Sequence, residues 1–494
     1  MALARSIPEA RNGVALNLSR IPSLPIEGFR SACLSAIAGG SRLAAVVLLP
    51  EDPAREPGEH LMAVLSDSAS SRFGFIAGRV PESRRFLSLS TEAPEASSFE
   101  REILEDHGIV PEGHPWLKPL RSHAGNYAFF RVEGDGVHEV AVGPVHAGII
   151  EPGHFRFQCH GERVLHLEIQ LGYQHRGARE LFLRSGPARR LVIAESVAGD
   201  TAVGHAVAYC EAIEGLSEME APLDAQRLRG IALELERIAN HVGDLGALCG
   251  DVGYLPGAAW FGRLRGEALG LLLEISGNRF GRGLLVPGGV RFGIEAASRR
   301  ALREQLDHLE ADFSEVAEMV FEAPSVVARF EQTGILKQED AVALGVVGPS
   351  ARASGVDRDA RRDHPAGIYR FAHIPTALQE SGDVMGRAVV RRLEVERSLQ
   401  FVREHLTELT EGPLTARTGP ARPNACLVSA VEGWRGEIVH LAITGYAGEI
   451  ASYTIVDPSF HNWHGLALAM RERQISDFPL CNKSFNLSYA GHDL

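Results

Sequence analysis

One long amphipathic stretch constrains the fold of this chain more than any other feature of its sequence. Between Asp224 and Gly250, apolar residues recur at alternating spacings of three and four positions. That spacing is typical of an α-helix that buries one face, and Asp224, which follows Pro222 closely, is a suitable N-cap. The apolar residues are Leu228, Ile231, Leu235, Ile238, Val242 and Leu245. Such a stripe needs other helices to cover it, so the sequence predicts a helix bundle.

Further helical and extended segments surround this stretch. A second stripe with helical spacing runs from Leu302 to Val320. Shorter helices are expected at residues 99–106, 260–275, 383–409 and 465–474. Strand candidates are residues 41–49, 86–89, 140–145, 155–159, 164–171, 426–431, 438–444 and 450–456. The last three alternate with Gly-containing turns, which predicts a small antiparallel sheet near the C-terminus.

Breaks in these patterns indicate how the chain is divided. The run Pro111-Glu-Gly-His-Pro115 interrupts regular structure, and Gly134-Asp-Gly136 supplies a flexible joint. We therefore place a domain boundary between Arg121 and Gly136. Residues 1–125 are predicted to form an α+β domain, and residues 136–494 a mainly α-helical domain with small antiparallel β sheets. The predicted fold class is α+β.

Composition excludes several classes of protein. Lys and Arg number 50 against 63 Asp and Glu, a net charge of −13 that is unlike the basic footprint of a nucleic-acid-binding protein. No apolar run approaches the roughly 18 residues needed to cross a bilayer, and the first residues lack a signal peptide. We expect a cytoplasmic protein whose contact with a membrane is made through partners. The six cysteines form no CxxC pair, which argues against a disulfide framework and against a cysteine-held zinc or iron–sulfur site.

Titratable residues concentrate in the segment 195–205. Glu195, Asp200, Thr201 and His205 are expected on one helical segment that Gly199 and Gly204 interrupt. The two glycines lower helix propensity, so we expect them to permit close approach of a neighbouring backbone or a ligand. Such a cluster could relay protons. The alternative, a helix with solvated polar groups, remains open on this segment alone.

Two other polar groups have simpler interpretations. Glu234, Arg237 and His241 flank the long stripe, and their spacing favours a polar seam between packed helices over a metal site. The Arg- and Asp-rich segment 348–367 could clamp an anion, but its charge density favours a solvated loop. The pair His461 and His464 is weak evidence for a metal site on spacing alone.

Several segments, taken in order, resemble the large subunit of group 4, energy-converting [NiFe]-hydrogenases and the related quinone-site large subunit of respiratory complex I. These segments are Gly143-Pro-Val-His146 with Glu151-Pro152, Gly172-Tyr-Gln-His-Arg-Gly177, Glu234-Leu-Glu-Arg-Ile-Ala-Asn-His241, Arg282-Gly-Leu-Leu-Val-Pro-Gly-Gly289, Gly348-Pro-Ser-Ala-Arg-Ala-Ser-Gly355 and Asp457-Pro-Ser459. Phe99-Glu-Arg-Glu-Ile103 and Gly113-His-Pro-Trp-Leu117 resemble the small subunit that complex I pairs with the large one. The resemblance implies a fusion of both subunits, as in formate-hydrogenlyase-type hydrogenases.

The resemblance does not carry the metal chemistry with it. Hydrogenases of this family hold nickel and iron with two CxxC pairs, and those positions fall here on Ala198, Thr201, Ser488 and Gly491. Hydroxyl and alkyl groups cannot replace bridging thiolates, so we expect no metal site and no cofactor within this chain. The two groups that hold the quinone head in complex I correspond to Ile150 and Ser196, which argues against the same quinone site.

The resemblance nevertheless implies a role for the polar residues that remain. Glu195 matches the carboxylate that serves as a proton gate in hydrogenases, and His205 matches the histidine after the first cysteine pair. We expect both to relay protons with Asp200 as support, around a hydrated cavity that Thr201, Ser488 and His492 also line.

By the same resemblance, the partners would be an iron–sulfur small subunit with a 4Fe-4S cluster and membrane subunits of the quinone-channel and antiporter-like types. The chain would then lie on the cytoplasmic face of the inner membrane and couple electron or proton transfer to ion translocation. Two alternatives stay open. The first is a subunit of a quinone- or NAD(P)H-linked oxidoreductase, and the second is a non-catalytic scaffold of an ion-translocating complex.

Overall fold

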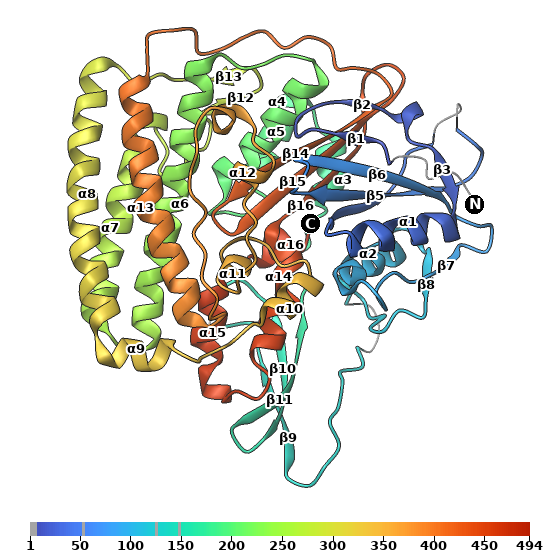
Figure 1. The fold of residues 1–494 in the computed structure, drawn as a ribbon, viewed down its shortest axis with the longest axis horizontal. Coiled ribbons are helices and arrows are strands. Elements are labelled where there is room, and N and C mark those ends of the chain that lie inside the picture. Colours follow the sequence, from blue (N-terminus) through green and yellow to red (C-terminus); the bar gives the residue numbers. More distant parts are fainter. Residues whose placement is uncertain (1–6, 52–54, 124–126, 147–149) are drawn as a thin grey trace.

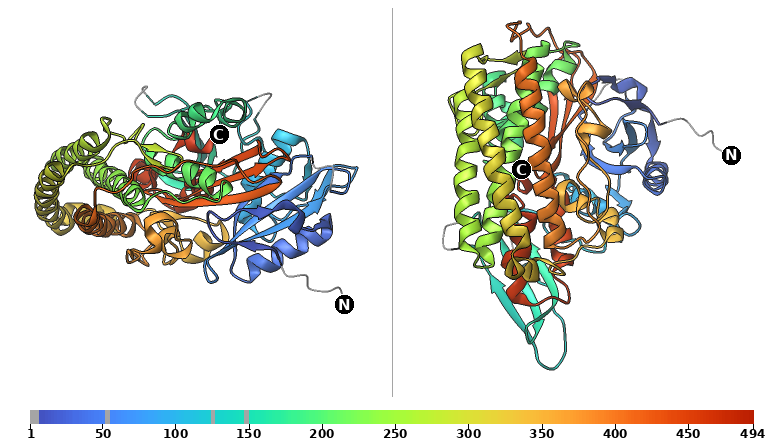
Figure 2. Two further views of the ribbon diagram at one scale, coloured as in Figure 1. Left: turned by 90° about the horizontal axis from the view of Figure 1, so that it is seen from above. Right: turned by 60° about the vertical axis from the view of Figure 1, so that its left-hand side comes forward.

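The computed structural model describes residues 7–51, 55–123, 127–146 and 150–494. Three layers follow one another across the molecule: a helix bundle, a sheet from the C-terminal part of the chain, and a sheet from the N-terminal part (Figure 1). Two further views show the same order, with the C-terminal sheet between the bundle and the N-terminal layer (Figure 2). The mixture of helices and small, mostly antiparallel sheets agrees with the predicted α+β class.

Four long helices make the bundle: α6 (Leu223–Asp251), α7 (Leu255–Ser276), α8 (Ala296–Glu322) and α13 (Val384–Glu408). Helix α6 packs against α7 and α13, and α8 closes the arrangement by packing against the same two helices. Both apolar stripes are buried in this core, as the sequence predicts. Asp224, however, is not the N-cap. The helix begins one residue earlier, and the Asp224 carboxylate instead accepts hydrogen bonds from the backbone N–H groups of Thr410 and Gly412.

The C-terminal sheet consists of β14 (Ala425–Gly433), β15 (Gly436–Thr444) and β16 (Ile450–Val456), with the short strand β2 (Leu16–Asn17) added beside β14. All residues of β14 and β15 are buried. Alternate side chains point to opposite faces of a strand. Leu427 and Val431 accordingly join the core of the bundle, whereas Cys426 and Val428 join the core of the N-terminal layer.

The N-terminal layer is a sheet of five strands with two helices. The strand order is β1-β6-β5-β4, and β3 pairs with β6 in parallel. Its elements are β1 (Glu9–Ala10), β3 (Ser23–Pro25), α1 (Ile26–Ala38), β4 (Arg42–Leu48), β5 (His60–Asp67), β6 (Arg72–Arg79) and α2 (Ser97–His107). One hydrophobic core joins this layer to the C-terminal sheet. The core of the N-terminal layer thus includes side chains from the C-terminal sheet. The division into domains at residues 1–125 and 136–494 stays a prediction.

The remaining elements surround these layers. A three-stranded antiparallel sheet contains β9 (Val137–Val142), β10 (His154–His160) and β11 (Arg163–Gln170), and a tight turn joins β10 to β11 as a hairpin. Short strands β7 (Arg85–Leu87) with β8 (Val110–Glu112), and β12 (Leu285–Val286) with β13 (Gly289–Val290), form two small pairs. No helix in the described parts of the chain is both long and apolar enough to span a bilayer.

Short helices complete the structure and correct one predicted boundary. They are α3 (Ala178–Arg184), α4 (Pro187–Ala194), α5 (Ala202–Leu216), α9 (Pro324–Phe330), α10 (Gln338–Ala343), α11 (Gly348–Arg352), α12 (Ala360–Asp363), α14 (Pro458–Ala469), α15 (Phe478–Phe485) and α16 (Tyr489–His492). The helix expected at 465–474 is α14. It begins earlier because Asp457 caps the Ser459 N–H at 2.8 Å and Pro458 occupies the first turn.

The charged segment 348–367 is buried, so the expectation of a solvated loop is wrong. Arg352 has 0% of its surface exposed and donates to Glu394 of α13 at 2.6 Å and to Glu432 of β14 at 2.8 Å. Arg361 pairs with Asp359 at 2.6 Å and with Glu234 of α6 at 3.2 Å. Buried charges persist where each has partners of opposite sign, and here the bundle and sheet supply those partners.

The predicted polar seam is part of the same network. Arg237 donates to Glu234 at 3.0 Å, and Nε2 of His241 donates a hydrogen bond to Glu394 at 2.8 Å. Arg237 also donates to the backbone of β14 at Glu432 and Gly433. The seam therefore ties α6 and α13 to the C-terminal sheet.

This network leads to a prediction about stability. Substituting Arg352→Ala leaves Glu394 and Glu432 without their main counter-charge in a buried site, which costs about 3–5 kcal/mol. The free energy of unfolding, measured with a chemical denaturant, should fall by that amount. The matched control is Arg362→Ala in the same segment, where the side chain is partly exposed and the loss should stay below about 1 kcal/mol. Equal losses for both variants would contradict the argument.

Candidate functional site

The segment 195–205 is not a single helix, contrary to the sequence-based prediction. Helix α4 ends at Ala194, residues 195–201 form turns, and α5 begins at Ala202. Glu236 of α6 explains the new start, because its carboxylate accepts hydrogen bonds from the N–H groups of Val203 at 2.7 Å and Gly204 at 3.0 Å. Those groups have no partner within their own helix. A residue distant in sequence therefore decides where α5 begins.

The two glycines of this segment behave differently. A Cβ atom on Gly204 would lie 2.8 Å from Cδ1 of Ile438, so the absence of a side chain lets α5 pack closely on β15. The group that approaches Gly204 is thus a side chain, and not the neighbouring backbone or ligand that was expected. No atom lies within 4 Å of the corresponding position on Gly199, so no neighbouring backbone approaches closely there.

Glu195 is a buried carboxyl that stabilises a neighbouring turn. It is 5% exposed, and its Oε1 accepts a hydrogen bond from the Gly283 N–H at 2.7 Å. Burial raises the pKa of Glu195, against the smaller opposing effects of the Gly283 N–H, Arg282 and Arg291. A carboxyl with a raised pKa can take up and release a proton closer to neutral pH than an exposed one.

Asp200 forms a two-pronged ion pair with Arg435, which lies in the turn between β14 and β15. The two N–O distances are 2.6 and 2.7 Å. Although burial opposes ionisation, Arg435 holds the pKa of Asp200 below its usual range. The same guanidinium donates to the Thr201 hydroxyl at 3.1 Å and to the Asn486 carbonyl at 2.6 Å. Arg435 thus bridges the α4–α5 turn and the C-terminal segment.

His205 lies in a buried chain of hydrogen bonds. Its Nε2 is 3.1 Å from Oδ2 of Asp457, and its Nδ1 is 3.1 Å from Nε2 of His440. The other ring nitrogen of His440 is 2.8 Å from the Tyr453 hydroxyl. Burial, reinforced by His205, keeps the pKa of His440 well below its ordinary value, so that ring stays neutral. Two imidazoles between a carboxylate and a phenol can shift a proton along the chain by exchanging tautomers.

The structure joins only part of the predicted relay. Among the described residues, no hydrogen bond or ion pair connects Glu195 to His205 or to Asp200. Asp200 and His205 are linked indirectly. Arg435 pairs with Asp200, Asp457 pairs with His205, and the charges of Arg435 and Asp457 act on each other's pKa. No local pattern pointed to His440 and Tyr453, which sit in apolar strands. Asp457 had a signal in the Asp-Pro-Ser helix start.

The residues at the four family cysteine positions do not fit a nickel–iron centre. Ala198 and Gly491 offer no donor, and the hydroxyls of Thr201 and Ser488 are poor substitutes for bridging thiolates. The Ser488 hydroxyl is engaged by the Gly491 N–H at 2.9 Å, and a Cβ on Gly491 would lie 2.5 Å from Cγ of Asp457. Arg435 and Asp457 take up part of the space that the sequence predicts to be a hydrated cavity.

The other groups considered from the sequence are also placed. No set of three or more His, Cys, Asp or Glu side chains within the described ranges is arranged to hold a metal ion. Ser196 donates its hydroxyl to the Val192 carbonyl at 2.6 Å, and Ile150 is 49% exposed. His492 pairs with Asp493 at 2.8 Å through Nδ1. Burial raises the pKa of the Cys426 thiol to about 12 and that of Cys481 to about 11, so both thiols stay protonated at neutral pH.

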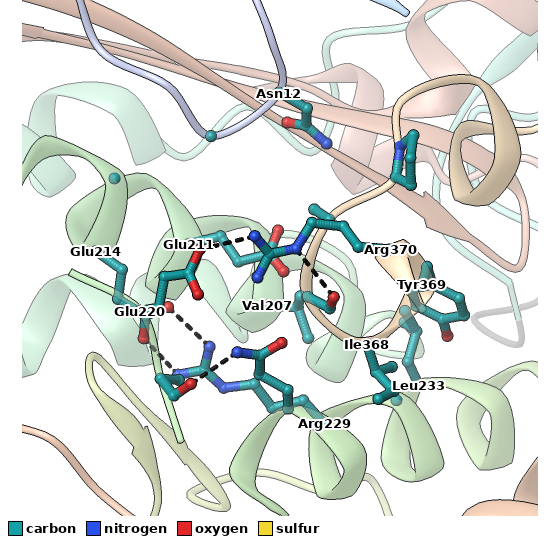
Figure 3. A pocket seen from close by; sticks show the side chains of 18 of the residues that line it. Asn12, Val207, Glu211, Glu214, Glu220, Arg229, Leu233, Ile368, Tyr369 and Arg370 are labelled. Carbon is teal, nitrogen blue, oxygen red and sulfur yellow. Dashed lines mark hydrogen bonds and ion pairs between the residues drawn. The ribbon is translucent and has the colours of Figure 1, made fainter. Parts of the chain in front are cut away.

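A polar cavity of about 140 Å³ lies between α5, α6 and the segment 365–370 (Figure 3). Its charges compensate one another, because Arg229 pairs with Glu214 at 2.9 Å and Arg370 with Glu220 at 2.7 Å. Glu211 also lines it, and burial raises the pKa of that carboxyl to about 7. With its arginines already paired, this cavity presents no free cationic group, and the candidate site remains the region around Asp200, His205 and Arg435.

Comparison with known proteins identifies relatives of this chain. Residues 251–422 match the family described as respiratory-chain NADH dehydrogenase, 49 kDa subunit. The chain is 30% identical over 441 residues to component G of hydrogenase-4 from Escherichia coli, covering 83% of this chain and 76% of that protein. It is 31% identical over 350 residues to the carbon monoxide-induced hydrogenase of Rhodospirillum rubrum, covering 71% and 97%.

A solved structure shares the fold. One chain of the membrane-bound sulfane sulfur reductase, an archaeal respiratory membrane complex, superimposes with a TM-score of 0.68 and 22% sequence identity. The match covers 73% of this chain and 99% of that one. At this level of identity the likeness concerns the fold alone, and it agrees with the family match.

Fold and sequence together define a large subunit of the hydrogenase and complex I type. The chain belongs to the family that contains the group 4 hydrogenase large subunits and the 49 kDa subunit of NADH dehydrogenase. Ala198, Thr201, Ser488 and Gly491, the positions that the resemblance assigns to the metal-binding cysteines, carry no thiol.

Glu236 generates a pH prediction. Burial raises the pKa of Glu236 to about 8, far above the value of about 4.3 in an unfolded chain. Between these values the folded protein holds a proton that the unfolded chain has released, so this group lowers the stability as pH rises. Glu236→Gln cannot ionise. The variant should therefore gain stability relative to the wild type on going from about pH 5.5 to about pH 7.5.

The measurement is the urea midpoint of unfolding at both pH values. Glu304→Gln on the exposed face of α8 is the matched control and should follow the wild type at each pH. An identical pH dependence in Glu236→Gln and in the wild type would show that Glu236 is ionised in the folded protein.

Proposed function

We propose that this chain is a metal-free large subunit of a membrane-associated complex related to energy-converting hydrogenases and complex I, and that it couples electron or proton transfer to ion translocation. One observation carries the proposal. A buried hydrogen-bonded chain from Asp457 through His205 and His440 to Tyr453 lies beside the positions where relatives hold their metals. The protein thus retains groups that move protons where it lacks groups that bind nickel.

The relay residues have different parts in this proposal. His205 passes protons between Asp457 and His440, because both of its ring nitrogens are engaged. Glu195 is a separate proton-exchanging group whose raised pKa suits uptake and release. Asp200 is a positioning residue, since its pairing with Arg435 fixes the guanidinium that faces Asp457.

We take the proposed partners from the resemblance to this family. An iron–sulfur small subunit would carry a 4Fe-4S cluster close to the α4–α5 turn, and membrane subunits of the quinone-channel and antiporter-like types would hold the pair at the cytoplasmic face of the inner membrane. Names of relatives such as "membrane-bound hydrogenase subunit alpha" support membrane partners in general. A scaffold without redox function is the second candidate, because the Arg435 ion pair occupies part of the former metal region.

Glu195→Gln tests the proposed role of Glu195 in proton exchange. The amide keeps the size of the side chain and can still accept from Gly283, but it cannot exchange a proton. The complex should assemble normally, while ion translocation should fall about tenfold or more, within the usual effect of removing a proton-transfer group. Translocation into membrane vesicles is the measurement. Glu180→Gln, which changes an exposed carboxylate on α3, should translocate at the wild-type rate. Normal translocation by Glu195→Gln would refute the proposed role of Glu195 in proton exchange.

Metal analysis separates the alternatives. A complex purified anaerobically through this subunit should contain iron and acid-labile sulfide from the partner, without stoichiometric nickel. Nickel in a one-to-one ratio would overturn the proposal, because a ligand set other than the family positions would then build a hydrogenase centre. An intact complex with neither metal would favour the scaffold.

A further inference from the structure

A cavity of about 320 Å³ lies where the N-terminal layer meets the β9–β11 sheet and α14. Helix α2 forms one wall, strand β11 a second, and helix α14 a third, and His492 of α16 also lines the cavity. Pro115 and Arg471 line the cavity and are exposed, so its mouth opens to solvent between them. The volume falls within the range of small-molecule binding sites. This cavity is distinct from the polar chain around His205.

The walls of the cavity are largely apolar. Both aromatic and aliphatic side chains line it. These residues are Trp116, Leu120, Leu167, Phe460, Trp463 and Leu468. Aromatic faces of this kind favour a flat or branched apolar group.

Two arginines give the cavity a positive charge. Arg101 is only 8% exposed, and its guanidinium donates to the carbonyl oxygens of Lys118 at 2.7 Å and Pro119 at 2.6 Å. Within the described ranges, neither Arg101 nor Arg471 has a carboxylate in ion-pair contact. The carboxylates that act on Arg101 electrostatically, Glu105 and Glu168, are not in direct ion-pair contact with it, so its guanidinium can accept an anion directly.

One carboxylate, that of Glu168, lines the cavity beside the two arginines and acts on the charge of Arg101. Glu168 already accepts from Lys118 Nζ at 2.6 Å and from the Phe130 N–H at 2.7 Å. The remaining charge of the cavity is thus positive in a chain whose net charge is −13.

His464 faces the same charges. Burial first, and then Arg101, His492 and His114, lower the pKa of His464 to about 4. The ring is therefore neutral at pH 7, and it makes no hydrogen bond to another described residue. It offers a donor and an acceptor inside the cavity beside the guanidinium of Arg101.

We propose that this cavity binds a small carboxylate with an aromatic or branched apolar body. The carboxylate lies against Arg101 with His464 beside it, because a guanidinium is suited to recognising carboxylate oxygens. The apolar body lies between Trp116, Phe460 and Trp463. Neither half of such a ligand is sufficient: acetate lacks the apolar body, and a neutral amide of the same shape lacks the charge.

The test is isothermal titration of the full chain with 2-naphthoate, 2-naphthamide and acetate. We expect one 2-naphthoate per chain, with the amide and acetate each binding about tenfold more weakly or worse, the loss expected for a missing charged or apolar contact. Equal binding of naphthoate and naphthamide would overturn the proposal. So would the absence of naphthoate binding at concentrations up to about 1 mM, the upper range for a weak specific site.

Variants locate the site. Ala467→Phe places a ring in the cavity from α14 and should abolish naphthoate binding, while Arg101→Gln should weaken it about tenfold. Because Arg101 also bonds to two carbonyls, exposed Arg471→Gln is a second charge variant, expected to weaken binding with an unchanged melting temperature. Arg163→Gln, on the same strand as His166 but outside the cavity, is the matched control. Wild-type affinity in Ala467→Phe would place the ligand elsewhere and refute the site.

Discussion

The packing of both faces of β14 and β15 joins the two hydrophobic cores of this molecule. Because every residue of both strands is buried, one face of the sheet completes the core of the helix bundle and the other completes the core of the N-terminal layer. Strands buried on both faces need apolar side chains on each of them. The short strand β2 and the Asn12 side chain, which exchanges two hydrogen bonds of 2.8 Å with Ala430, fasten the N-terminal segment to the same strand.

The turn between these strands also shapes the site. It carries Trp434 and Arg435, and the indole N–H donates to the Thr201 hydroxyl while the guanidinium stacks on the ring and pairs with Asp200. Thr201 thus places a hydroxyl where the resemblance expects a thiolate, and that hydroxyl already accepts hydrogen bonds from Trp434 and Arg435. The chemistry that remains depends on imidazoles and a carboxylate, groups that move protons and do not hold soft metals in a bridging arrangement.

The sequence predicted the helices with strong periodicity well and the polar segments poorly. The stripes of α6 and α8 dictate burial through local spacing, so their existence and faces follow directly. The start of α5 depends on Glu236, and the burial of Arg352 depends on Glu394 and Glu432, which are remote in sequence. The chain from Asp457 to Tyr453 likewise joins residues of α5, β15 and β16. Local pattern carries no information about such partners until the fold brings them together.

The pairing of β2 with β14 has a consequence for how the chain acquires its structure. Asn17 lies opposite Ala425, so the sheet joins segments separated by roughly 400 residues, and such non-local contacts form late because the intervening chain must first be ordered. During synthesis, the apolar face of the N-terminal sheet emerges long before the strands that cover it. The nascent protein therefore has an extended period in which that face is open to chaperones or to premature association.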